Sequence, residues 1–238
     1  MNPHNRLMNL LAKNAGTGKA IRSFDQGDAG LEIYVYDVID PWFGVSAEAF
    51  GKAIRSEPNR PLTVRVNSPG GDAFEGRSIA SLIRAHQGPT RVIVDGLAAS
   101  AASTIAIAAQ QTDIADGGFL MIHNAWTLAL GGAEDLEDTA QLLRKIDGEL
   151  AKDYANRAGV SEQQATDWMK AETWFTADEA VQAGLASSVV KSAAEFEAFN
   201  LAAFNKAPKA LLDRLALPTQ LQIRESAARR LRLFEALA

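Results

Sequence analysis

Apolar positions along the middle of the chain follow the two-residue period of strands in some stretches and the longer period of helices in others. Strands are predicted where apolar and β-branched residues alternate or run together, at "LEIYVYDVI" (31–39), "LTVRVNS" (62–68) and "TRVIVDG" (90–96). Shorter strands are predicted for "TDIAD" (112–116), "FLMIHNA" (119–125) and "SSVV" (187–190). These strands are spread over the whole central region, with helical patterns between them.

Predicted helices separate the strands, and several carry start or stop signals. The expected helices span 46–56, 74–87, an alanine-rich stretch after Ser100, and Ala133–Ala158. Ser46 suits an N-cap, and "SEQQ" from Ser161 and "TADE" from Thr176 match a capping box. Gly184 stands where a left-handed residue ends a helix. Strands alternating with helices predict an α/β layered domain whose strands are largely parallel.

Composition changes along the chain and suggests three parts. Residues 1–29 are polar and are expected to form a mobile N-terminal arm, and residues 30–192 are expected to form the folded domain. Residues 193–238 are expected to be a helical, partly basic tail. Within it, "ARRLRLFEAL" (228–237) sets three arginines beside leucines. This stretch could be a partner-binding amphipathic helix, a disordered basic segment, a removable extension or a partly solvated tail.

Composition also excludes several classes of protein. The 238 residues carry a net charge of -5, so nothing suggests a nucleic-acid binder. There is no cysteine, which excludes disulfides, thiolate metal sites and a cysteine nucleophile. The first twenty residues lack a long apolar run, so neither a signal peptide nor a membrane span is predicted. We therefore expect a soluble cytoplasmic protein.

Two glycine- and serine-rich stretches combine small residues with possible chemistry. In "VNSPGGDAFEG" (66–76), Pro69 and the following glycine pair require a sharp turn and let backbone N–H groups approach a ligand, as an oxyanion hole would need. The alternative is an ordinary strand–turn–helix connection. In "GLAASAAS" (96–103), Ser100 stands where a strand passes into a helix, which suits a nucleophile. Ser103, one turn later, is interpreted as a packed serine bonded to a backbone carbonyl.

A serine nucleophile needs a neighbouring base, usually a histidine. The chain has three histidines: His4 lies in the arm, His86 ends a helix, and His123 ends an apolar strand. A lone histidine at a strand end is usually structural, but the serine and the glycine turn favour His123 as the base.

Four motifs together resemble a known family. "NSPGG", "GLAAS", "MIHNA" and "ETWFTADEAVQAGLASSVV" occur in an order and at spacings similar to the proteolytic subunit of the Clp protease (ClpP), and most like the ClpP-like head-maturation (prohead) proteases of tailed phages and prophages. The resemblance covers residues 31–190. It implies a ClpP/crotonase-like superhelix of repeated ββα-type units with a protruding strand–helix handle, and serine endopeptidase chemistry without metal or cofactor.

The resemblance assigns roles to particular residues. It implies that Ser100 is the nucleophile, His123 the general base, and the backbone N–H groups of Gly71 and Ala101 the oxyanion hole. The family's aspartate falls on Glu172, which is one methylene longer, so this assignment leaves a solvated carboxylate as the alternative. Asp167 and Asp178 are the other candidate acids, although Asp178 suits the first turn of a helix.

The resemblance also implies partners. "WTLALGGAEDLEDTAQLL" (126–143) is similar to the family's handle, so a homo-oligomeric ring with inward-facing sites is expected. The implied substrate is a polypeptide, a capsid or scaffold protein if the phage likeness holds. The arm and the tail lie outside the ClpP pattern, so docking to an unfoldase ATPase does not follow.

Two other functions compete with the triad. A Ser–Lys dyad of the signal-peptide-peptidase type could use Lys145 or Lys152 if either were desolvated. A catalytically idle scaffold that keeps the fold is the second alternative.

Overall fold

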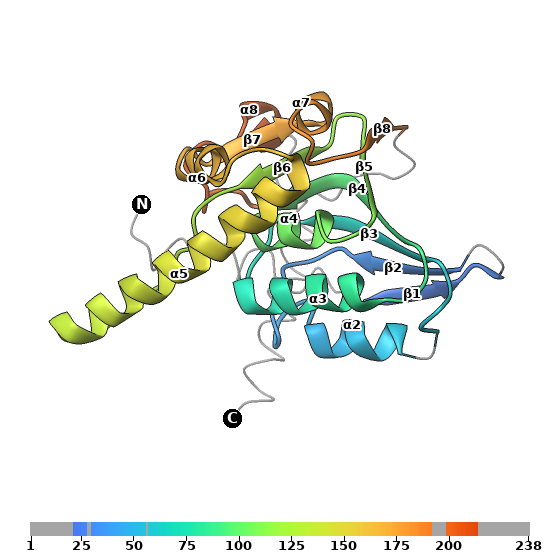
Figure 1. The fold of residues 1–238 in the computed structure, drawn as a ribbon, viewed down its shortest axis with the longest axis horizontal. Helices are drawn as coiled ribbons and strands as arrows, with labels where there is room; N and C mark the ends of the chain where they lie inside the picture. Colours follow the sequence, from blue (N-terminus) through green and yellow to red (C-terminus); the bar gives the residue numbers. More distant parts are fainter. Residues whose placement is uncertain (1–20, 28–29, 56, 192–198, 214–238) are drawn as a thin grey trace, which may run out of the picture.

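The computed structural model describes residues 21–27, 30–55, 57–191 and 199–213 (Figure 1). The strands, in chain order, are β1 (Arg22–Asp25), β2 (Leu31–Val35), β3 (Leu62–Ser68), β4 (Thr90–Ala99), β5 (Gln111–Ala115), β6 (Phe119–Ile122), β7 (Thr173–Thr176) and β8 (Ser188–Val190). The helices are α2 (Ala47–Ile54), α3 (Ala73–Ala85), α4 (Ala101–Ala106), α5 (Ala133–Ala158), α6 (Glu162–Lys170), α7 (Ala177–Gln182) and α8 (Lys209–Asp213).

The strands form one mixed sheet in the order β1-β2-β3-β4-β5-β8. All neighbours from β2 to β8 pair in parallel, whereas β1 is antiparallel to β2. Strand β4 has two partners on one edge. Residues 91–94 pair with β5, and residues 97–99 pair with β6, which is also antiparallel to β7. The prediction of an α/β domain with largely parallel strands is confirmed.

One face of the sheet packs against helices. Strand residues alternate in burial, and the apolar set Leu62, Val64 and Val66 of β3 joins one large core. Helices α2 and α3 lie over this face, and α5 extends beyond the body of the fold (Figure 1). Only the C-terminal end of α5 is buried, through residues such as Leu150 and Tyr154.

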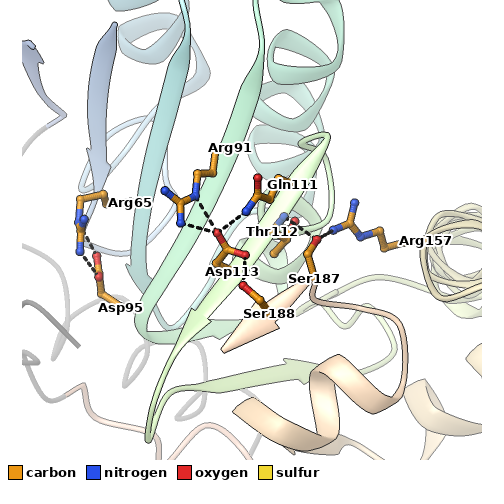
Figure 2. Close-up of polar contacts among 9 residues, drawn as sticks. All are labelled: Arg65, Arg91, Asp95, Gln111, Thr112, Asp113, Arg157, Ser187 and Ser188. Carbon is orange, nitrogen blue, oxygen red and sulfur yellow. Dashed lines mark hydrogen bonds and ion pairs between the residues drawn. The ribbon is translucent and has the colours of Figure 1, made fainter. Parts of the chain in front are cut away.

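The opposite face carries ion pairs between neighbouring strands (Figure 2). Arg65 on β3 pairs with Asp95 on β4. Arg91 on β4 pairs with Asp113 on β5, whose other oxygen accepts a 2.7 Å hydrogen bond from Ser188 on β8. These contacts link the four parallel strands β3, β4, β5 and β8 on the face opposite the main core. They also provide partners for carboxylates that would otherwise be costly to bury.

The local sequence signals explain where several helices begin and end. Ser46 accepts a hydrogen bond from Ala49 N, and Ser161 accepts one from Gln164 N, as N-caps do. Thr176 and Glu179 form the full capping box that "TADE" predicts. Gly184 has the left-handed φ of 76° expected of a residue that ends a helix.

The structure differs from the prediction at several places. Residues 22–25, assigned to the arm, form β1, because their backbone pairs with the edge of β2. Strand β7 was not predicted, since "TWFT" is too short to show a clear pattern. Residues 123–131 form no strand, because the described part of the chain offers them no pairing neighbour, so the handle consists of α5 alone.

The predicted tail also contributes to the fold. Residues 199–204 pack against the sheet, and α8 follows them. His4 and the basic stretch 228–237 lie outside the described residues, and the division near residues 29 and 192 remains a prediction. Within the described ranges, every helix is too short or too polar to cross a lipid bilayer.

Candidate active site

Ser100 occupies a strained turn between β4 and α4. Its φ of 54° and ψ of -124° are unusual for a residue with a side chain, and such backbone strain costs about 1–3 kcal/mol. The turn is fixed on both sides. Ser100 N donates to Met121 O at 2.9 Å, and Ser100 O accepts from Ser103 N at 2.9 Å. The hydroxyl of Ser100 is therefore presented by a rigid backbone rather than by a loop.

Ser103 has the structural role that the sequence predicted. Its hydroxyl donates to Ser100 O at 2.6 Å, and its Oγ lies 2.7 Å from the buried hydroxyl of Tyr154 on α5. The side chain is fully buried, so it braces the turn and is not exposed to a substrate.

His123 lies at the end of β6, directly beside Ser100. Its Nε2 is 2.7 Å from Ser100 Oγ, although 23 positions separate the two residues. The sheet explains the approach, because β4 and β6 pair in parallel with Ala99 opposite Met121, so both chains leave the sheet side by side. Burial lowers the pKa of His123 from 6.5 to about 4, while the charge of Glu172 acts in the opposite direction. The imidazole is therefore neutral near pH 7, the form in which Nε2 accepts the hydroxyl proton.

Glu172 lies close enough to His123 to act on its charge, but the two side chains share no hydrogen bond in the described structure. Glu172 follows α6 with a left-handed φ of 50°, a conformation that a glycine would adopt more easily. Its carboxylate accepts hydrogen bonds from the backbone N–H groups of Asn205 and Lys206, at 3.0 and 2.6 Å.

The other candidate acids lie elsewhere. Asp167 is exposed on α6 and accepts a 2.9 Å hydrogen bond from Gln163. Asp178 is exposed in the first turn of α7, as its position in the sequence suggested. Neither is among the groups that influence His123, so Glu172 is the carboxylate that the fold brings to the imidazole.

The glycine pair lies against the nucleophile. A Cβ on Gly70, whose φ is 87°, would come within 2.5 Å of Ala99 O and 2.7 Å of Ser100 Cβ. Ile39 N donates a hydrogen bond to Gly70 O, and Asp72 N donates one to Ile39 O, so both neighbours of Gly71 are held by Ile39. In the described part of the chain, neither Gly71 N–H nor Ala101 N–H has an acceptor. Both groups can therefore donate to a ligand, and their role as an oxyanion hole stays a prediction.

The residues of the competing mechanism are not desolvated. Lys152 is half-exposed on α5, and Glu149 beside it raises its pKa through a 2.7 Å hydrogen bond. Lys145 is also exposed on α5. His86 lies at the C-terminal end of α3, where its Nε2 is 2.7 Å from Arg60 O, and it has no hydrogen bond to Ser100 in the described structure.

Three residues near the site were not expected from the sequence. Phe204, Asn205 and Lys206 belong to the predicted tail, yet they line a pocket of about 330 Å³ together with His123 and Glu172. The signal available was weak: "FNLAAF" (199–204) places three large apolar residues in a polar region, without a regular period. No cluster of three or more potential metal ligands occurs among the described residues.

Comparisons with known proteins show which family the chain belongs to. A family model described as Clp protease matches residues 53–193. The ATP-dependent Clp protease proteolytic subunit 1 of Protochlamydia amoebophila is 30% identical over 172 residues, which cover 69% of this chain and 82% of that protein. The corresponding subunit 2 of Treponema denticola is 32% identical over 135 residues, 56% of this chain and 68% of its own length.

A solved structure shows the same fold. A single-site mutant of ClpP1 from Listeria monocytogenes superposes with a TM-score of 0.61 and 22% sequence identity, over 68% of this chain and 92% of that one. The family match includes Ser100, His123 and Glu172 and spans more than half of the sequence. Because the family model and these relatives match more than half of the sequence, the chain belongs to the Clp protease family, a family of serine endopeptidases.

Proposed function

We propose that this protein hydrolyses peptide bonds with Ser100 as nucleophile, His123 as general base and Glu172 as the acidic member of a triad. The observation that carries the proposal is the 2.7 Å approach of Ser100 Oγ to His123 Nε2 at a strained, braced turn. Hydroxyl and imidazole at this distance can exchange a proton as the hydroxyl attacks a carbonyl.

The first half of the reaction would form an acyl-enzyme. His123 Nε2 takes the proton of Ser100 as Oγ bonds to the carbonyl carbon, whose oxygen becomes negatively charged. The N–H groups of Gly71 and Ala101 then stabilise that oxygen; in comparable enzymes one such donor contributes about 2.7–4 kcal/mol. The imidazolium passes its proton to the leaving amine as the C–N bond breaks.

The second half would restore the enzyme. Water attacks the ester carbonyl while His123 accepts its proton, and the same N–H groups again stabilise the oxyanion. The proton returns to Ser100 Oγ as the carboxylic acid product leaves. Glu172 stabilises the imidazolium in both halves, which matters because burial alone disfavours that cation.

Hydrolysis of fluorogenic peptides tests this proposal. The purified full chain should cleave them, and Ser100→Ala should abolish turnover. Ser78→Ala, an exposed serine on α3, is the matched control and should keep wild-type activity. Cleavage that persists in Ser100→Ala, at a rate close to wild type, would overturn the assignment of the nucleophile.

The two alternatives predict different results. A Ser–Lys dyad requires that Lys145→Ala or Lys152→Ala stops turnover while His123→Ala does not, which the exposure of both lysines disfavours. An idle scaffold requires that the assembled wild-type protein neither cleaves peptides nor reacts with serine-directed probes. The available hydroxyl and the unoccupied N–H donors favour an active enzyme.

We also propose a homo-oligomeric ring assembled through α5 and the segment before it. Leu130 is 91% exposed, and Leu136 and Leu142 are each about half exposed on the free part of α5. Exposed leucines on a protruding helix and on the segment before it suit contact with a second copy. Native mass spectrometry should show a closed oligomer, and Leu136→Glu with Leu142→Glu should reduce its population.

A phage capsid or scaffold protein is proposed as the substrate, on the likeness of the four motifs to head-maturation proteases. Mass spectrometry of the protein coexpressed with its genomic neighbours would identify cleaved partners. The relatives bear names that describe them as ATP-dependent. Because the chemistry above uses only side chains, backbone and water, we propose that this chain cleaves short peptides equally well with and without ATP.

A further inference from the structure

A segment beyond the last strand returns to the catalytic residues. Residues 199–206, here called the returning segment, cover the part of the sheet next to the serine turn. Phe199, Leu201 and Phe204 are buried against Leu97, Ala99 and Met121, and so form a second, smaller apolar cluster. The ends of β4 and β6 that carry Ser100 and His123 therefore have the returning segment on one side and the main core on the other.

Phe204 contacts the imidazole directly. Its ring centre lies 5.7 Å from that of His123 with the planes at 86°, and a similar edge-on contact at 5.6 Å joins it to Trp174. Edge-on aromatic contacts at this distance are favourable and exclude water. The ring thus accounts for part of the burial that keeps His123 neutral.

The next two residues hold the carboxylate. Asn205 N donates to Glu172 Oε2 at 3.0 Å, and Lys206 N donates to Glu172 Oε1 at 2.6 Å. Trp174 Nε1 reaches Oε1 at 3.4 Å, and Lys206 Nζ donates to Ala171 O at 2.5 Å. Two consecutive amides on one carboxylate fix its position. Since Glu172 makes no described hydrogen bond to His123, the returning segment determines where this carboxylate lies.

We propose that residues 204–206 are positioning residues of the active site: the backbone amides of Asn205 and Lys206 hold Glu172 beside the imidazole, and Phe204 shields His123 from water. This inference rests on the proposed serine endopeptidase function. It assigns a catalytic contribution to a part of the chain beyond residue 193, where the match to the Clp protease family ends.

The two parts of the returning segment have opposite effects on the protonation of the imidazole: Phe204 acts directly, and the amides of Asn205 and Lys206 act through Glu172. Shielding by Phe204 favours the neutral base, whereas Glu172 favours the imidazolium that forms during the reaction. The other charged groups around this site are Lys170 and Lys206, which line the same pocket, and Asp147, which accepts a hydrogen bond from Ala125 N. Loss of the amides and loss of the ring should therefore give distinguishable results.

The test measures the rate of Ser100 modification by a fluorophosphonate between pH 5 and 8, in the full chain. Lys206→Pro removes the shorter amide bond together with the 2.5 Å hydrogen bond from Lys206 Nζ to Ala171 O, and a shift of the carboxylate by 1 Å should slow modification by about 10²-fold. Lys209→Pro is the matched control: it stands at the first position of α8, where proline is tolerated, and should react like wild type.

The second variant tests the shield. In Phe204→Ala, the modification rate should decrease as the pH is lowered past about 6.5, where an ordinary histidine titrates. The wild-type rate should stay constant down to pH 5. Phe204→Leu keeps apolar bulk and should restore the flat profile, whereas a merely structural defect in Phe204→Ala would lower the rate by the same factor at every pH. The folded fraction of each variant is measured by circular dichroism.

The outcomes separate this inference from the proposed function. If wild type reacts at Ser100 but Lys206→Pro reacts equally fast or faster, and Phe204→Ala keeps a flat profile, the positioning role is overturned. If wild type itself does not react, the proposed function fails first.

Discussion

Ser100 and His123 leave two paired strands side by side, and the parallel register of Ala99 with Met121 brings Oγ and Nε2 to 2.7 Å. The pair is thus a consequence of the sheet. Ser100 N also donates to Met121 O, so one backbone hydrogen bond ties the serine turn to the strand that carries the histidine. The paired strands β4 and β6 thus keep the nucleophile and its base within proton-transfer distance of each other.

Gly70→Ala should strongly reduce activity. The new methyl would lie 2.5 Å from Ala99 O at a φ of 87°, so either the serine turn or the glycine loop must move. The measurement is kcat/KM for a fluorogenic peptide, and a loss of about 10²-fold or more is expected for a displacement near 1 Å.

Gly148→Ala provides the matched control for that substitution. A Cβ at this exposed position on α5 meets nothing within 4 Å, so activity should be unchanged and stability should rise by about 0.5–1 kcal/mol. If both variants behaved alike, the close approach of Gly70 to the serine turn would have no functional meaning.

The acid side of the pH–rate profile should be shifted. Because burial lowers the pKa of His123 to about 4, kcat/KM should stay nearly flat from pH 8 to pH 5, whereas an ordinary histidine would lose half its activity at 6.5. As the pH is lowered, the unfolded chain takes up this proton near 6.5 and the folded chain only near 4. The free energy of unfolding should therefore decrease as the pH is lowered from 6.5 to 4. An activity midpoint at 6.5, with an unfolding free energy that does not change between pH 6.5 and pH 4 through this group, would contradict a desolvated base.

Glu172→Gln should lower kcat by about 10²–10⁴-fold, since the charge that stabilises the imidazolium is lost. One carboxylate oxygen also becomes an amide NH2 group, which cannot accept a hydrogen bond from the returning segment. Asp167→Asn, the same kind of change in the exposed acid on α6, should leave kcat near wild type. The reverse pattern would identify Asp167 as the functional acid.

Asp113→Ala should destabilise the sheet by about 1–3 kcal/mol, because it leaves Arg91 and Ser188 without their shared carboxylate while the partly exposed Arg91 can still be solvated. The free energy of unfolding in denaturant measures this change. Glu149→Ala removes only an exposed pair with Lys152 and should leave that free energy unchanged. Equal effects would mean that the contacts of Asp113 drawn in Figure 2 do not stabilise the fold.

The sequence predicted best where local chemistry determines structure. Ser46, Thr176 and Gly184 end or begin helices as expected, and the predicted bounds of α5 were correct at both ends. The serine turn was also recognisable, because a serine among glycine and alanine after an apolar strand has few structural reasons to be there. These features depend on neighbours within a few residues.

The sequence predicted least where structure depends on distant partners. Strand β1 was assigned to a mobile arm, since only the edge of β2 gives its backbone hydrogen bonds. Phe204 and Lys206 were placed in a tail because their partners, His123 and Glu172, lie more than thirty positions away and no period reveals the contact. The environment of Glu172 was missed for the same reason, although its position in the motif was noticed.

The central claim is that one hydroxyl, that of Ser100, is activated by His123. The most direct test is to treat the wild-type protein with a fluorophosphonate at pH 7 and to map the adduct by peptide mass spectrometry. A single adduct on Ser100, strongly reduced in His123→Ala, is the predicted result. An adduct on another residue, or one on Ser100 that forms equally fast without the imidazole, would contradict it.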